Sequence, residues 1–375
     1  MYRRSLSAIL VITFNATRFF STKEYQLKIP KICVDPKYAF YKDSNMKVGV
    51  FSCKPYDRAA FESRSSQYGF DLVFIDSILN AETVVLAKPF DAICIFVNDD
   101  INSEVLDKLH EFGIIHIALR CTGFNNVDLV KAEKLGISVS RVPNYSAESV
   151  AEHTLALILG LNRKLLKANS RMRHNNFELD GLLGFNLRGK TIGVIGTGKI
   201  GRVFINILSG FGCTILCNDI SSSESIKNMG HEYVDLSELI GRSDIISLHC
   251  PLTAQNQHMI GHHEITMMKD NVMIINTSRG GLINPQAIIG GLKSGKIGYL
   301  GIDMYEMESE LSAKNIICEC ISDDTYRRLA TFSNVLITHH LGFFTHESLQ
   351  QIVDTTLVNL QYCFVGKVCP DTFLA

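Results

Sequence analysis

The sequence predicts an α/β fold in two domains, each with a mainly parallel sheet. Its 375 residues, at about 150 residues per domain, favour two domains over one. Short apolar runs alternate with helical patterns from Met46 onward, which is typical of a sheet whose parallel strands are joined by helices. The alternation restarts after residue 171. A chain that is 46% hydrophobic and 20% charged has enough apolar residues for two cores.

The composition excludes several classes of function. The 37 Lys and Arg balance 38 Asp and Glu, for a net charge of -1, so the electrostatic term that drives nucleic-acid binding is missing. The 11 cysteines contain no CxxC pair and no zinc-type spacing, so we expect reduced thiols in an intracellular compartment and no metal site. Beyond the N-terminal region, no apolar stretch approaches 18 residues without charges, and no membrane span is expected.

Residues 1–45 differ from the remainder of the chain. The stretch 1–23 carries three arginines and a lysine, with no acidic residue before Glu24. Its apolar residues recur at helical spacing, and residues 18–21 resemble a matrix-protease cleavage site, so we expect a mitochondrial matrix address. Residues 8–14 alternatively suit a secretory signal, which the many thiols disfavour. If translation starts instead at Met46, the protein is cytoplasmic.

The first half of the sequence predicts four strands, two short helices and one long helix. The strands are expected at 47–52, 71–74, 92–96 and 114–118, and the short helices at 102–112 and 126–135. The long helix is expected from Ala147 to Arg171, with Ser146 as its N-cap and one apolar face that ends at Leu165.

The second half predicts six strands and a closing helix. The strands are expected at 191–195, 213–218, 244–248, 271–275, 297–302 and 334–337, and the helix at 345–363.

A glycine-rich turn follows the strand at 191–195. Gly196, Gly198 and Gly201 stand in a GxGxxG pattern between a strand and a helix, and Asp219 ends the next strand. These glycines permit a tight turn, close approach of a pyrophosphate and close helix packing, while the helix start binds phosphate. Asp219 can accept hydrogen bonds from the adenosine ribose and would repel a 2′-phosphate, which favours NAD over NADP. Alternatively, Asp219 is a solvated acid at a strand end.

Three later strands each end in polar residues that suit hydride transfer to a 2-keto acid. Arg279 can hold the substrate carboxylate and polarise its carbonyl. A histidine at 339 or 340 can donate the proton, and a carboxylate at 306 or 308 can stabilise and orient the imidazolium. Each residue alone could be a surface ion pair or a hydrogen-bonded core group. The sequence pattern does not choose within the two histidines or the two glutamates.

These motifs resemble those of the D-isomer-specific 2-hydroxyacid dehydrogenase family. The resemblance rests on the segments 196–201, Asn276–Gly281, Asp303–Glu308 and Thr338–His340, and it extends over 46–375. It is greatest to the NAD-dependent branch that reduces pyruvate to D-lactate. The family implies catalytic roles for Arg279, Glu308 and His340, with His340 as the proton donor.

The resemblance also implies a domain arrangement and an assembly. A Rossmann NAD domain of 147–340 would be inserted in a flavodoxin-like substrate domain of 46–146 and 341–375, both doubly wound. Relatives suggest a homodimer or homotetramer. The substrate would be a small 2-keto or 2-hydroxy acid, with no nucleic-acid or membrane partner. The alternatives are a larger 2-keto acid, such as phenylpyruvate or hydroxypyruvate, and a non-catalytic NAD-sensing corepressor.

Two sets of contact residues are carried over by similarity. Around NAD we expect Gly196, Gly198, Lys199, Ile200, Gly201, Asp219, Cys250, Pro251, Asn256, Thr277, Ser278, Arg279 and Asp303. Around the substrate we expect Phe96, Thr122, Gly123, Tyr145, Arg279 and Phe343, with the backbone N–H groups of Thr122 and Gly123 on the carboxylate. Some relatives carry tyrosine where this chain has Phe96, which bears on substrate preference and leaves the chemistry unchanged.

Overall fold

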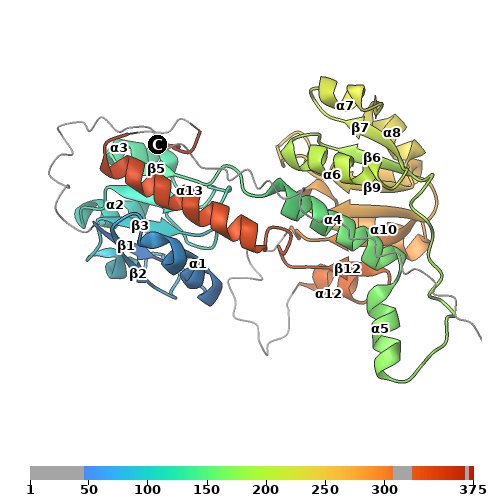
Figure 1. Ribbon diagram of the computed structural model, residues 1–375, viewed down its shortest axis with the longest axis horizontal. Helices are drawn as coiled ribbons and strands as arrows, with labels where there is room; N and C mark the ends of the chain where they lie inside the picture. The colour runs from blue at the N-terminus through green and yellow to red at the C-terminus, as the bar shows by residue number, and fades with distance from the viewer. Residues whose placement is uncertain (1–45, 307–322, 368–370) are drawn as a thin grey trace, which may run out of the picture.

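The computed structural model describes residues 46–306, 323–367 and 371–375. They form two lobes, each built on a parallel sheet with helices on its faces (Figure 1). The predicted α/β class with two parallel sheets is confirmed. The N-terminal extension 1–45 and Glu308 lie outside the described residues, and the predicted domain limits stay predictions.

The first sheet has five strands in the order β2-β1-β3-β4-β5, all parallel. Their bounds are β1 Met46–Val50, β2 Phe70–Phe74, β3 Ala92–Ile95, β4 His116–Leu119 and β5 Ser138–Ser140. Every residue of β3 and β4 is buried, as expected for parallel strands covered on both faces. The helices of this part are α1 Pro55–Ser65, η2 Val84–Ala87, α2 Ser103–Glu111 and α3 Leu129–Leu135.

The second sheet has seven parallel strands in the order β12-β11-β10-β9-β6-β7-β8. Their bounds are β6 Thr191–Ile195, β7 Thr214–Asn218, β8 Glu232–Tyr233, β9 Ile245–Leu248, β10 Val272–Asn276, β11 Ile297–Ile302 and β12 Val335–Ile337. The strand order reverses between β6 and β9, which lie next to one another in space. In doubly wound sheets the ligand crevice opens at this switch point, beyond the carboxyl ends of the strands.

Several helical segments of the described residues belong to or adjoin the second sheet. They are α4 Ala147–Asn162, α5 Leu165–Arg173, α6 Lys199–Ser209, α7 Glu224–Asn228, α8 Leu236–Arg242, α9 His262–Met267, η3 Gly280–Leu282, α10 Pro285–Ser294 and α12 Asp324–Ala330. The last helix, α13 His346–Phe364, crosses back and packs on α1 and β4 of the first lobe (Figure 1). Near the chain end, Phe373 forms an antiparallel bridge with Ser140. The C-terminus therefore completes the lobe that the N-terminal strands begin.

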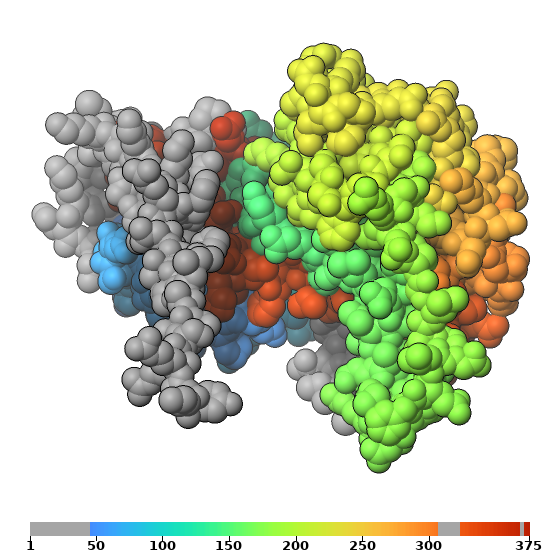
Figure 2. Space-filling view, turned by 45° about the vertical axis from the view of Figure 1, so that its right-hand side comes forward, coloured from blue at the N-terminus to red at the C-terminus, as the bar shows by residue number. Residues whose placement is uncertain are grey.

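The long helix predicted over 147–171 is wrong, because the chain breaks at Lys164. Lys164 has φ +49 and separates α4 from α5. The buried Asn162 side chain exchanges hydrogen bonds of 2.7 and 2.8 Å with the backbone of Phe185, and this tertiary contact holds the turn. Leu165, predicted on the buried face, is 56% exposed. Together, α5 and the segment after it project from the second lobe (Figure 2).

Other differences are small and have local causes. The helix predicted from 126 starts at Leu129 because the Asp128 carboxylate caps it through the backbone N–H of Lys131. The closing helix starts one residue late because Thr345 is its N-cap. The strand β5 was not predicted, since three residues with two serines carry too little pattern. Within the described ranges no helix is long and apolar enough to cross a membrane.

Candidate active site

The glycine turn forms a cradle in front of α6. Gly196 has φ +94, and a Cβ there would lie 2.5 Å from the backbone nitrogen of Cys250. A Cβ on Gly201 would lie 2.1 Å from the carbonyl oxygen of Gly196. At Gly198, the N-cap of α6, a Cβ would meet no atom within 4 Å. The turn is thus closed toward the protein and open beyond the helix start, which suits the phosphates of a dinucleotide.

Asp219 lies directly after β7 and faces this turn. Its Oδ2 accepts hydrogen bonds from the backbone N–H of Thr197 at 2.6 Å and from the Thr197 hydroxyl at 3.0 Å. Burial alone would raise the pKa of Asp219, but these hydrogen bonds and one from Ser221 outweigh it and lower the pKa. The carboxylate is therefore charged at neutral pH. That charge suits ribose hydroxyls and opposes a 2′-phosphate.

The loops after β9 and β10 meet beside the glycine turn. Ser278 Oγ donates to the carbonyl of Cys250 at 2.6 Å, and Asn256 Nδ2 donates to the carbonyl of Pro251 at 2.8 Å. Thr277 contacts Thr154 of α4 through their hydroxyls at 2.9 Å. Lys199 and Ile200 open α6 on the other side of the switch point. These predicted cofactor residues thus lie at the carboxyl ends of β6, β9 and β10.

A cavity of about 350 Å³ is lined by residues of both lobes. Seven predicted site residues line it together: Phe96, Thr122, Gly123, Tyr145, Arg279, His340 and Phe343. The first four come from the first sheet and its exit toward α4, Arg279 comes from the end of β10, and the last two follow β12. The Phe343 ring lies 5.8 Å from the ring of Tyr145 and 5.7 Å from that of His340, centroid to centroid.

Arg279 is held by its backbone while its side chain stays exposed. Asn276 Nδ2 donates to the Arg279 carbonyl at 2.9 Å, and Arg279 Nη1 donates to the Ser278 carbonyl at 2.8 Å. A Cβ on the next residue, Gly280, would lie 2.2 Å from the backbone nitrogen of Glu306. Only glycine fits this crossing of the two loops, which places the guanidinium at the cavity.

His340 occupies a left-handed backbone conformation, with φ +51, which costs energy for a residue other than glycine. Asp303 holds it there. The His340 N–H donates to the Asp303 carbonyl at 2.8 Å, and the Asp303 carboxylate accepts the N–H groups of Leu341 at 2.8 Å and Gly342 at 2.9 Å. Asp303 was predicted as a cofactor contact, and the structure places its carboxylate on the loop that carries His340.

The Asp303 carboxylate is also contacted by His153, a residue that the sequence motifs did not single out as part of the site. His153 Nε2 lies 3.3 Å from Asp303 Oδ1, and Thr338 Oγ1 donates to the same oxygen at 2.5 Å. The Asp303 side chain is 3% exposed. Burial alone would raise its pKa, but the contacts with His153, Thr338 and the two backbone N–H groups lower the pKa to about 2.

The structure distinguishes the two histidines, His339 and His340, and describes one of the two candidate glutamates. His340 lines the cavity beside Arg279, whereas His339 lines only a neighbouring cavity. Glu306 lines the same cavity as Arg279, but its Oε1 lies 2.9 Å from Nε2 of His258. Glu306 is therefore paired with another histidine. Glu308, the predicted catalytic carboxylate, lies outside the described residues.

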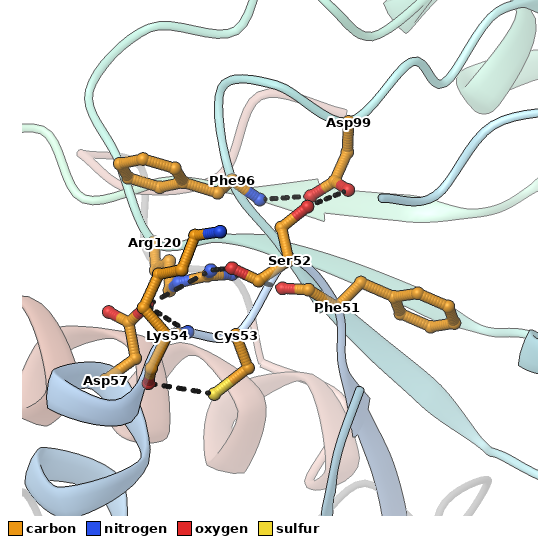
Figure 3. Close-up of polar contacts among 8 residues, drawn as sticks. All are labelled: Phe51, Ser52, Cys53, Lys54, Asp57, Phe96, Asp99 and Arg120. Atoms are coloured by element: carbon orange, nitrogen blue, oxygen red, sulfur yellow. Dashed lines mark hydrogen bonds and ion pairs between the residues drawn. The ribbon is translucent and has the colours of Figure 1, made fainter. Parts of the chain in front are cut away.

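Arg120, at the end of β4, is a second arginine at the cavity, and the sequence analysis missed its importance. Its side chain is 1% exposed and donates to the carbonyls of Phe51 at 2.9 Å and Ser52 at 2.8 Å (Figure 3). An arginine directly after an apolar strand was the signal for it. No group of three or more His, Cys, Asp or Glu within the described ranges could hold a metal ion.

Comparison with known proteins agrees with this geometry. The family model for the D-isomer specific 2-hydroxyacid dehydrogenase, NAD binding domain, matches residues 155–342. A 2-hydroxyacid dehydrogenase homolog of Haemophilus influenzae is 49% identical over 329 residues, which cover 88% of this chain and 99% of that protein. A D-lactate dehydrogenase of Escherichia coli is 48% identical over 326 residues, with coverage of 87% and 99%.

The solved structures agree as well. The apo-structure of D-lactate dehydrogenase from Escherichia coli matches with a TM-score of 0.80 and 46% identity, and covers 87% of this chain and 99% of that one.

Proposed function

The chain belongs to the D-isomer-specific 2-hydroxyacid dehydrogenase family, and from that premise we propose that this NAD-dependent enzyme reduces pyruvate to D-lactate. The observation that carries the proposal is the cavity shared by Arg279, His340 and four aromatic rings, of which Tyr305 is the fourth. The rings of Phe96, Tyr145 and Phe343 narrow this space, which favours a substrate with a small side chain.

Arg279 and the first lobe bind the substrate acid. The guanidinium holds the carboxylate as a fork and polarises the carbonyl that is reduced. The backbone N–H groups of Thr122 and Gly123 complete the carboxylate site from the opposite wall. When bound, NADH supplies the hydride. Residues from both lobes must meet for this geometry, so we expect the lobes to close on the substrate.

His340 donates the proton that the reduced oxygen needs, and it takes the proton back in the oxidation direction. Its ring orientation follows from the backbone conformation that Asp303 holds through the N–H groups of Leu341 and Gly342. We assign Glu308 as the carboxylate that stabilises the charged imidazole, in agreement with the family motif.

Turnover of the full chain with NADH and pyruvate tests the proposal. We expect NADH oxidation with stoichiometric lactate, and chiral chromatography should identify the product as the D-isomer. L-lactate, or a kcat/KM for pyruvate far below that for phenylpyruvate or hydroxypyruvate, would overturn it.

A larger 2-keto acid is the second candidate, and a neighbouring cavity favours it. This side cavity has a volume of about 500 Å³ and shares Phe96, His340 and Phe343 with the first cavity. It also contains Lys54, Tyr56 and Asp76, so a longer side chain would have space beyond the aromatic wall. The same assay separates the candidates when the 2-keto acids are compared at equal NADH.

We propose that the enzyme is a homodimer or homotetramer. Six apolar side chains of α5 and the segment after it are at least half exposed, in a part of the second lobe that projects outward (Figures 1 and 2). They are Leu165, Leu166, Met172, Phe177, Leu179 and Leu183. Apolar patches of this kind are typical of protein interfaces. Light scattering after size exclusion would contradict the proposal if it gave the monomer mass.

We propose a mitochondrial matrix location, with the cytoplasm as the alternative. The support is the basic, acid-free stretch 1–23. Residues 1–45 fused to a fluorescent protein should carry it into mitochondria, and a diffuse cytoplasmic signal would favour a start at Met46.

A further inference from the structure

Arg120 carries a buried charge that the proposed reaction does not use. Its guanidinium Nη2 lies 3.5 Å from Oδ2 of Asp57, and the charge of the buried Asp99 carboxylate acts on it as well. Its Nε is buried and has no hydrogen-bond partner among the described residues. Burying a charge with incomplete pairing is costly, and an apolar residue often serves stability as well or better. Stability alone therefore does not explain why an arginine is placed at the cavity.

The guanidinium lies against the face of Phe96. The distance from Arg120 Cζ to the Phe96 ring centroid is 4.9 Å, within the range of a cation–π contact, which is strongest where water is excluded. The two carbonyls of Phe51 and Ser52 hold the guanidinium at the end of β1. The ring therefore packs against a cation that is hydrogen-bonded to the backbone just after β1 (Figure 3).

The backbone of Phe96 is fixed independently. Its N–H donates to Oδ2 of the buried Asp99 at 2.6 Å, and its carbonyl accepts from Asn126 Nδ2 at 3.0 Å. With the backbone fixed by these two contacts, the orientation of the ring is the remaining freedom of this residue. The ring packs on one side against the apolar core of the first lobe, and the face of Arg120 is its charged contact.

Phe96 lies where two cavities adjoin, together with Val97, Asn98, His340 and Phe343, which also line both. Phe96 lines both the cavity of about 350 Å³ that contains Arg279 and the side cavity of about 500 Å³ that contains Lys54. A ring held against Arg120 restricts the first cavity to a short substrate side chain. A ring free to turn would join the two spaces and admit a longer one.

We propose that Arg120 is a positioning residue that sets substrate length by holding Phe96 in place where the two cavities adjoin. The inference rests on the proposed reduction of 2-keto acids at the cavity of Arg279. It assigns Arg120 no contact with the reacting atoms.

The test measures kcat and KM of the full chain for pyruvate and for 2-oxohexanoate, in wild type, Arg120→Met, Arg120→Lys and Phe96→Leu. In Arg120→Met we expect the ratio of kcat/KM for 2-oxohexanoate to that for pyruvate to rise about 10-fold, the scale of a hydrophobic pocket that gains or loses a methylene. The pyruvate loss should appear mainly in KM, with NADH affinity unchanged. Arg120→Lys keeps a cation under the ring and should return the ratio to within about 3-fold of wild type.

Phe96→Leu should raise the ratio by itself, and adding Arg120→Met to it should raise the ratio no further, because the two residues act as one unit. Arg58→Met is the matched control, since Arg58 Cζ lies 5.2 Å from the ring of Phe74 and lines neither cavity. Its ratio should equal that of wild type.

A purely structural role would lower turnover of both acids and NADH binding together and leave the ratio unchanged; that result overturns the inference. If Arg120→Met does not fold, the ratios of Arg120→Lys and Phe96→Leu decide, and a wild-type ratio in Phe96→Leu overturns it. Wild type that reduces neither acid refutes the proposed function instead.

Discussion

Asp303 offers a direct test of how the site is held, because one buried carboxylate organises the loop that carries His340. Asparagine in its place keeps the shape and removes the charge. The NH2 group of the new asparagine would also face backbone N–H groups that now donate to Asp303, so two hydrogen-bond donors would meet without an acceptor. Substitution Asp303→Asn should therefore both destabilise the fold and displace the His340 ring.

The size of the effect follows from the pKa of Asp303. Its fall from 3.8 to about 2, at about 1.4 kcal/mol per pKa unit, corresponds to about 2 kcal/mol of stability at neutral pH. Because the folded pKa lies below the unfolded one, this contribution is complete above about pH 4 and is lost as the pH falls toward 2.

Urea unfolding at pH 7 measures the loss, with far-UV circular dichroism as the probe since the chain has no tryptophan. We expect Asp303→Asn to lower the free energy of unfolding by about 2 kcal/mol and to lower kcat as well. Asp270→Asn is the control: that carboxylate is 90% exposed and 2.8 Å from Lys296, so its unfolding free energy should stay close to that of wild type. Equal unfolding free energies and equal kcat in wild type and Asp303→Asn would refute the assigned role.

Three further predictions follow from the geometry. His340→Ala should lower kcat by about 100- to 10,000-fold while a fluorescence titration shows unchanged NADH affinity, and wild-type turnover would remove His340 from the mechanism. Asp219→Ala should reduce the preference for NADH over NADPH, measured as the ratio of kcat/KM values, and an unchanged ratio would contradict the ribose contact. Burial lowers the pKa of His116 to about 3, so the folded protein resists its protonation and loses stability as the pH falls below 6.5. Between pH 6.5 and pH 5, the unfolding free energy of His116→Gln should therefore fall by about 2 kcal/mol less than that of wild type. Urea unfolding at the two pH values measures both decreases, and equal decreases would exclude this role.

The strands and the glycine turn could be predicted from patterns of a few neighbouring residues. The strands at 191–195 and 297–302 have the predicted bounds, because an apolar run flanked by polar residues marks a buried parallel strand by itself. The turn between Gly196 and Gly201 was also predictable, since steric limits on a tight crossing act within a few residues. The α4–α5 break was not, because Asn162 is held by Phe185, 23 residues away.

The polar residues at the strand ends were predicted only in part from the sequence. Their order along the chain predicted that Arg279 and His340 reach one edge of a parallel sheet, because carboxyl ends of parallel strands lie together. The pattern did not separate Glu306 from Glu308. In space, the contact between Glu306 and His258 pairs that residue with a histidine 48 positions earlier, which no local pattern records.

The sequence by itself determined the α/β class, the dinucleotide turn and the presence of polar residues after three strands, because each depends on residues close together in the chain. The tertiary structure alone decided how those side chains are held. Asp303 reaches Gly342 across 39 positions, and Arg120 reaches Phe51 across 69. Such contacts join segments that are far apart in the chain, so no spacing along the sequence encodes them.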